Sequence, residues 1–104
     1  MDAQDLYEGL EESGYPVAYD HFKSAQDPPF VCYRFLEAAD FKADNENYLP
    51  IGDYHVELYA ANKDPTAEAA IEAQLKALGL PFAKSETFID SEDMYQVLYE
   101  VRLI

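Results

Sequence analysis

Alternation of apolar and polar side chains with a period of two is the feature that most constrains this chain. The last segment, MYQVLYEVRLI, places on one face the side chains of Tyr95, Val97, Tyr99, Val101 and Leu103. Because successive side chains of a strand point to opposite faces, this pattern predicts a strand with one buried face. Residues 54–60 repeat the pattern. Residues 30–38 are apolar on much of both faces, which predicts a strand inside the sheet.

Two segments have the helical period instead. Residues 2–13 carry apolar side chains at i, i+3, i+4 and i+7, and Gly14 follows them as a left-handed stop. Asp64 and Pro65 are a cap and a first-turn residue that begin a second helix, whose apolar stripe ends before Gly79. We expect both helices to pack on the sheet through their apolar stripes.

The other segments complete the predicted order of elements. Residues 17–22 alternate as a short strand, residues 23–29 form a loop that contains two prolines, and residues 82–104 form a hairpin around the turn DSED. Pro50 and Gly52 precede the middle alternating strand and predict a bulge or an unpaired edge at its beginning.

Together these elements predict one domain, residues 1–104, of the α+β class. The expected architecture is a mixed, mainly antiparallel sheet of about five strands with two helices packed on one face. The order of elements is α-β-β-β-α-β-β. The apolar C-terminus, Ile104, is expected to be held in the sheet or at a contact.

The charge of the chain excludes one broad class of function. It has 21 acidic and 7 basic residues, a formal charge of −14, so its field repels nucleic acid.

A single cysteine excludes an internal disulfide and a zinc site built from cysteines. The acidic N-terminus lacks the pattern of a secretory leader, and no apolar run approaches the length of a membrane span. We therefore expect neither a membrane partner nor specific binding of nucleic acid.

A search for catalytic or metal-binding patterns gives no candidate. Cys32 lies in an apolar strand and is expected to be buried, while His21 and His55 lie in alternating segments as sheet-surface residues. The acidic segment DNENYLPIGDYH lacks the glycine and glutamate of the helix-loop-helix calcium motif. The four glycines are scattered and form no phosphate loop. We predict a protein that is not an enzyme, with no catalytic, cofactor-binding or metal-binding residue.

One polar stretch is a candidate contact surface. DNEN, residues 44–47, stands directly before a predicted strand, and Phe41 and Tyr48 flank it. Interfaces are enriched in aromatic residues, so a hairpin tip carrying them is typical of an arm that contacts another protein. Packing of these aromatics back onto the domain is the alternative. The predicted assembly-interface residues are Phe41, Asp44, Asn45, Glu46, Asn47 and Tyr48.

Several short strings resemble a known family. YPVAYDHF, PPFVCYRF, ADFKADNENY, YHVELYAANKD and SETFIDSEDMYQVLYEV, in this order, are similar to the tail-completion or tail-terminator proteins of long-tailed bacteriophages and of prophages in Gram-positive bacteria. The resemblance runs from about Tyr15 to Val101. It implies the same order of elements and a homo-oligomeric ring, typically of six subunits, that caps the tail tube and docks the filled head.

The resemblance also implies partners and a location. The partners would be the tail-tube protein and a head-tail connector, and no cofactor is implied. The protein would be assembled in the cytoplasm of the bacterial host and would become part of the virion tail. The loop between the second and third strands would be an assembly arm, and DNA would pass through the ring without specific binding, aided by an acidic lumen.

Three other specific functions remain open at this stage, besides a dimerising domain with no further assigned role. A head-tail connector of the same module has a similar size and fold class. An acidic inhibitor that mimics DNA and blocks a host nuclease would explain the charge, although a mimic should space its carboxylates along one surface. A small enzyme is the third, without a nucleophile and base to support it.

Overall fold

The computed structural model describes the backbone of residues 1–39, 41–43 and 46–104, and the side chains of residues 1–39 and 50–104. These described residues form two α-helices, seven strands and one short 3-10 helix. In chain order they are α1 (Ala3–Glu11), β1 (Val17–Tyr19), β2 (Phe30–Ala38), β3 (Phe41–Ala43), β4 (Glu46–Leu49), β5 (Gly52–Ala60), α2 (Pro65–Ala77), β6 (Ala83–Ile89), η1 (Asp90–Glu92) and β7 (Met94–Leu103).

Five of the strands form one mixed sheet in the order β1-β2-β5-β7-β6. Among the strands that the structure describes, β1 and β2 are parallel, and the other neighbours in this sheet are antiparallel. The strands β3 and β4 pair only with each other and form a hairpin inserted between β2 and β5. The predicted class and element order are confirmed, with this hairpin as an addition to the five-stranded sheet.

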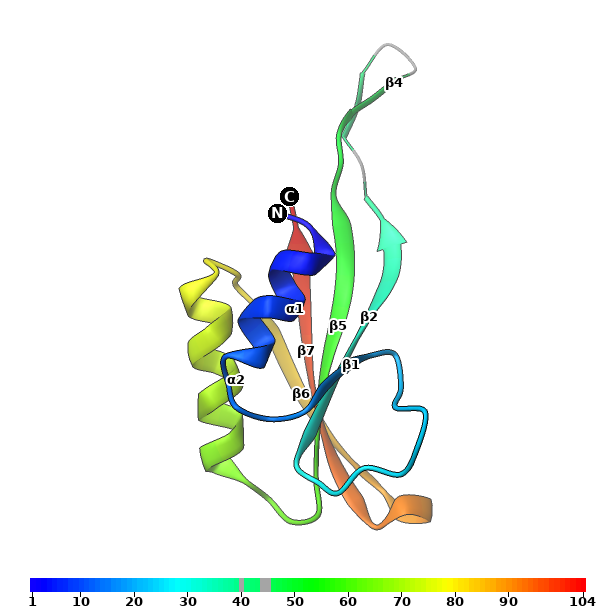
Figure 1. Cartoon of the computed structure of the whole chain (residues 1–104). Coiled ribbons are helices and arrows are strands. Elements are labelled where there is room, and N and C mark those ends of the chain that lie inside the picture. The colour runs from blue at the N-terminus through cyan, green and yellow to red at the C-terminus, as the bar shows by residue number, and fades with distance from the viewer. Residues whose placement is uncertain (40, 44–45) are drawn as a thin grey trace.

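Both helices lie on the same face of the sheet (Figure 1). Most of the alternating residues of β2, β5 and β7 that point toward the helices are buried, as the period of two predicted, whereas Phe35 near the end of β2 is exposed. Each fully buried aliphatic side chain contributes about 1.5–3 kcal/mol through removal of its surface from water. The fully buried members of this core are Leu6, Leu10, Val31, Val56, Leu58, Ala67, Ile71, Leu75 and Tyr99.

The helix ends follow the sequence signals. Asp2 and Asp5 form a reciprocal capping box at the start of α1. At α2 the Asp64 carboxylate accepts a hydrogen bond from the Ala67 backbone N–H at 3.0 Å, and Pro65 takes the first turn. Gly79 has a φ of +72°, the left-handed conformation that ends a helix.

Two sequence predictions are corrected by the structure. The strand predicted over residues 17–22 ends at Tyr19, because Asp20 takes a positive φ of 64° that no extended strand tolerates. Pro50 and Gly52 predicted a bulge or an unpaired edge, and the edge alternative is wrong. Register shifts do occur nearby, in β2 between Phe35 and Glu37 where it pairs with the start of β5, and between Phe41 and Lys42 in the β3–β4 pair. The strand β5 is central and is paired on both sides from Gly52 onward, since Pro50 precedes the ladder and removes no donor from it.

The C-terminal end of the sheet is held by its backbone. Leu103 is buried at the end of β7, whereas the Ile104 side chain is 60% exposed. The Met1 nitrogen donates a hydrogen bond to the Ile104 carbonyl oxygen at 2.7 Å, so residues from both ends of the sequence lie side by side (Figure 1).

We predict that Gly79→Ala lowers the free energy of unfolding by about 1–2 kcal/mol, because an L-residue with a β-carbon is strained at positive φ. No atom lies within 4 Å of the position that the new β-carbon would take, so the cost is one of backbone conformation. Gly79→Asn should cost less, since asparagine tolerates this region. Urea unfolding monitored by circular dichroism measures both variants.

The control is Lys76→Ala, an exposed position in the last turn of α2, which should change stability by less than about 0.5 kcal/mol. Equal stability of Gly79→Ala and the unmodified chain would contradict the left-handed helix end.

Candidate functional site: the arm, its base and the open face of the sheet

The hairpin between β2 and β5 projects from the sheet beyond both ends of the chain (Figure 1). We call residues 39–51 the arm. At its base the Ala39 N–H donates a hydrogen bond to the Ile51 carbonyl oxygen at 2.8 Å, which continues the β2–β5 pairing into the arm. Farther out, Phe41 lies opposite Leu49 and Ala43 opposite Glu46. The whole molecule is elongated, with extents of 49 × 28 × 24 Å.

The predicted assembly-interface residues all belong to the arm. Phe41 is in β3, and Glu46, Asn47 and Tyr48 are in β4. Asp44 and Asn45 lie outside the described residues, as do the side chains of the other four. The backbone thus places four of the six on one two-stranded hairpin, while their contacts stay a prediction.

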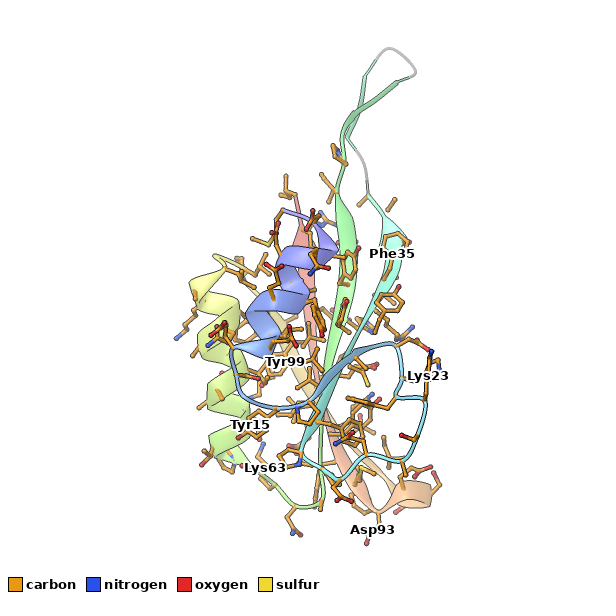
Figure 2. All side chains as sticks on the ribbon, viewed as in Figure 1. Tyr15, Lys23, Phe35, Lys63, Asp93 and Tyr99 are labelled. Carbon is orange, nitrogen blue, oxygen red and sulfur yellow. The ribbon has the colours of Figure 1, made fainter. Side chains whose placement is uncertain are left out.

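An apolar surface at the base of the arm was not found from the sequence. Met1 and Phe35 are each 45% exposed and lie beside the exposed Ile104, around a shallow hollow of about 330 Å³. Phe35 sits on the part of β2 that leads into the arm (Figure 2), and its ring packs on Tyr54 at 5.5 Å between centroids. The paired strands β2 and β5 extend beyond α1, so the helix does not cover the apolar side chains on this part of the sheet.

The face of the sheet opposite the helices is polar and held by cross-strand contacts. Arg34 Nε lies 3.4 Å from the buried Glu57 carboxylate, and the Tyr59 hydroxyl donates to the same group at 3.3 Å. Asp53 faces Arg102 across β5 and β7 and binds its guanidinium through both carboxylate oxygens, at 2.7 and 3.1 Å. This guanidinium holds the pKa of the Asp53 carboxyl below its ordinary value.

A second charged cluster joins α2 to the edge of the sheet. Glu68, only 5% exposed, lies 2.8 Å from both the Lys63 and the Lys84 ammonium groups. Lys84 also binds Glu72 at 2.8 Å, and the buried Tyr99 hydroxyl donates to the same Glu72 oxygen at 2.8 Å. This cluster fixes the helix over β6 and β7.

The pKa values of this cluster follow from its geometry. Burial opposes ionisation of Glu68, but the two ammonium groups outweigh it and lower the pKa of this carboxyl below 4.5. The Lys84 ammonium group likewise lowers the pKa of Glu72. Desolvation, together with the hydrogen bond to Glu72, raises the pKa of the Tyr99 hydroxyl, which therefore remains a donor at neutral pH.

The single cysteine, Cys32, is buried as expected. Cys32 is 3% exposed beneath a hollow of about 440 Å³ formed by residues 20–26 and the open face of the sheet. Desolvation and the nearby Glu57 charge raise the pKa of the thiol to about 11, so it stays protonated at neutral pH. His21 binds the neighbouring Asp20 carboxylate at 2.9 Å in the exposed loop, not in a strand as predicted, because β1 has already ended. His55, on the sheet surface as predicted, lies 3.5 Å from Glu100.

Within the described part of the chain, no group of three or more His, Cys, Asp or Glu side chains could hold a metal ion. Of the helices described, none is long and apolar enough to cross a membrane.

Comparison with known proteins gives one informative result. No family model matches the chain, and no curated protein matches it in sequence. Among solved structures, its fold is similar to that of a chain from the virion of a native gene transfer agent particle, with a TM-score of 0.68. The match covers 95% of this chain and 87% of the other at 19% identity, so the likeness concerns the fold.

We predict that Glu68→Gln lowers the free energy of unfolding at pH 7 by about 1–3 kcal/mol, because it leaves two ammonium groups without their shared carboxylate. The pKa of this carboxyl is lower in the folded state than in the unfolded state. Such a group contributes its full stabilisation when the pH is above the pKa of the unfolded state, near 4.5. This stabilisation is lost as the pH falls through the lower pKa of the folded state. The difference between variant and unmodified chain should therefore shrink below about pH 4.5.

Urea unfolding across a pH series measures this difference. The control is Glu12→Gln, an exposed position at the C-terminal cap of α1, which should change stability by less than about 0.5 kcal/mol at each pH. A Glu68→Gln effect that stays constant from pH 7 to below pH 4 would show that lost packing, not lost charge, is responsible.

Proposed function

We propose that this chain is a structural protein of a phage-like particle, and more specifically a tail protein. In this role it caps the tail tube as a ring of six copies and takes part in head-tail joining. The observation that carries the proposal is the likeness in fold, over nearly the whole chain, to a protein chain of a gene transfer agent virion. The short strings that resemble tail-terminator proteins support the same role independently.

The arm is the feature that suits ring assembly. A closed ring requires a heterologous contact, in which one surface of a subunit meets a different surface of the next. The arm leaves the body of the domain, and apolar side chains stay exposed at its base, including Met1, Phe35 and Ile104. An arm reaching a neighbour, together with an apolar base, provides two different surfaces of this kind.

The proposed partners follow from the proposed position. The ring would contact the tail-tube protein on one side and a head-tail connector on the other, in the virion tail, after assembly in the cytoplasm of the bacterial host. DNA would slide through the ring without specific binding, since a net charge of −14 repels phosphates. The proposal assigns the chain no catalytic activity, cofactor or membrane contact.

A DNA mimic is disfavoured by how the acids are used. Asp53, Glu57, Glu68 and Glu72 each bind an arginine or lysine of this chain, on both faces of the sheet. Such carboxylates do not imitate a row of free phosphates. A nuclease assay in which the protein fails to protect DNA would separate the two functions, and sedimentation with purified tail tubes would separate a tail terminator from a connector.

We predict that deletion of residues 43–48 abolishes the ring and leaves a folded domain. The deletion removes the tip of the arm, whereas the core lies between the helices and the sheet. Native mass spectrometry over a concentration and salt series should find a complex near six subunits for the unmodified chain. Salt should strengthen the complex, because it screens the repulsion between acidic subunits.

The matched control is Phe41→Ser with Tyr48→Ser, which keeps the length of the arm and removes its two aromatic rings. If the arm makes its contact through these two aromatic side chains, this variant should lose the six-membered complex as the deletion does. A six-membered complex that survives the deletion would contradict the role of the arm. An unmodified chain that remains monomeric even with tail tubes present would contradict the proposed function.

A further inference from the structure

The outer edge of β6 is an open strand edge. Ala83–Ile89 pair with β7 in an unbroken register, and no other described strand pairs with β6. Residues 83–88 are all exposed. Proteins usually block such an edge with a proline, a bulge, a very short strand or charged side chains, and β6 has no proline or bulge over its seven residues. Its two charged side chains, Lys84 and Glu86, lie on the helix face and bind acids and a lysine of the same chain.

The opposite edge of the sheet is blocked. The strand β1 has only three residues, and the Tyr19 hydroxyl accepts a hydrogen bond from the Phe35 backbone N–H at 3.1 Å where β1 ends. The bulge between Phe35 and Glu37 then distorts the free part of β2. The two edges therefore differ, and only β6 offers a long regular ladder to another strand.

The side chains of β6 and its flanking residue match those of a second copy of the same segment that runs in the opposite direction. Residues 82–88 read FAKSETF, with Ser85 at the centre. If two copies pair antiparallel about Ser85, each lysine meets a glutamate and each phenylalanine meets a phenylalanine. The facing pairs are Phe82 with Phe88, Ala83 with Thr87, Lys84 with Glu86, and Ser85 with Ser85.

The register of β6 on β7 makes this pairing geometrically consistent. Lys84, Glu86 and Phe88 lie opposite Tyr99, Val97 and Tyr95, whose side chains are on the helix face of the sheet. Ser85 and Thr87 lie on the open face. Side chains that face each other across an antiparallel pair share one face, and the pairing about Ser85 joins residues of the same face throughout.

Other registers that keep the faces matched are electrostatically worse. A shift that centres the pair on Glu86 sets two glutamates against each other, and one centred on Lys84 sets two lysines against each other. Like charges directly opposite destabilise a strand pair, whereas opposite charges stabilise it. The charges thus disfavour these two neighbouring registers and favour pairing about Ser85 with a second copy of the same strand.

We propose that β6 docks onto β6 of a second copy of this chain, antiparallel and with a twofold axis through Ser85, so that the two five-stranded sheets become continuous. Phe88, 43% exposed, meets the Phe82 ring of the partner copy. Lys84, which binds Glu68 and Glu72 in its own chain, lies opposite Glu86, which binds Lys63, so each facing charge already has a partner. The contact is isologous, so one partner saturates it and the open edge does not grow into fibres. It uses a surface remote from the arm and does not depend on the proposed tail function.

Ser85→Cys tests the proposal directly. Residue 85 lies opposite itself in the proposed pair, within the Cα separation that a disulfide spans. The chain has one other cysteine, Cys32, which is 3% exposed. Under mild oxidation, non-reducing electrophoresis should show Ser85→Cys mainly as a covalent dimer.

The matched control is Thr87→Cys, exposed on the same face of the same strand. In the proposed pair the two copies of residue 87 are displaced by four residues, about 13 Å, so they should remain uncoupled. Equal cross-linking of both variants indicates random collision and overturns the proposal. Absence of cross-linking in Ser85→Cys, or cross-linking of Thr87→Cys alone, overturns it as well.

The same cross-link separates this contact from the proposed ring. Ser85→Cys placed in the chain lacking residues 43–48 should still form the covalent dimer after the ring is lost. A cross-link that disappears together with the arm would show that β6 pairing is secondary to the ring and would overturn an independent β6 contact.

Discussion

The apolar contact between the two helices and one face of the sheet is the interaction on which the rest of the structure depends. The sheet is five strands wide and is covered by helices on one side only. The large apolar side chains of the core cluster point to that side, and Tyr99 (Figure 2) is buried among them. Its hydroxyl donates a hydrogen bond to Glu72. Every other surface of the sheet must therefore be satisfied by polar groups, by a loop or by another molecule.

The structure uses each of these solutions in a different place. Residues 20–26 lie against part of the open face, beside Cys32 and Tyr59. Ion pairs such as Arg102 with Asp53 occupy another part of it, because cross-strand neighbours of opposite charge can satisfy each other in water. Tyr19 caps one edge. The arm, its apolar base and β6 are the surfaces that remain, so these are where contacts with other molecules are expected.

Much of this fold could be predicted from the sequence, because the signals were local. The period of two in β2, β5 and β7 and the caps of α2 required no knowledge of distant residues. The pairing of β1 with β2, by contrast, depends on how residues 20–29 return across the sheet, and periodicity does not record that path. The early end of β1 at Asp20 was missed because a positive φ leaves no pattern in an otherwise alternating segment.

The candidate site was predictable only in part, for a similar reason. The arm was found because DNEN is a local turn signal between two strands, and its backbone forms the hairpin expected. The apolar base depends on residues 1, 35 and 104 coming together, which follows from the strand order alone. The burial of Glu68 was not predicted, because in the sequence it interrupts the apolar stripe of α2 just as an exposed acid would. The two lysines that bind it come from a loop and from β6.

The charge balance decides which of these surfaces can associate. Of the seven basic residues, Arg34, Lys63, Lys84 and Arg102 already bind acids within the chain. The remaining surface is consequently strongly acidic, and two copies repel each other over most orientations. Close approach is favourable only where the local charge is balanced or absent. The apolar base of the arm meets that condition through its apolar side chains, and β6 meets it because its lysine and its glutamate each bind an opposite charge of the same chain. In a chain this acidic, local neutrality is therefore a stronger guide to an interface than apolar character alone.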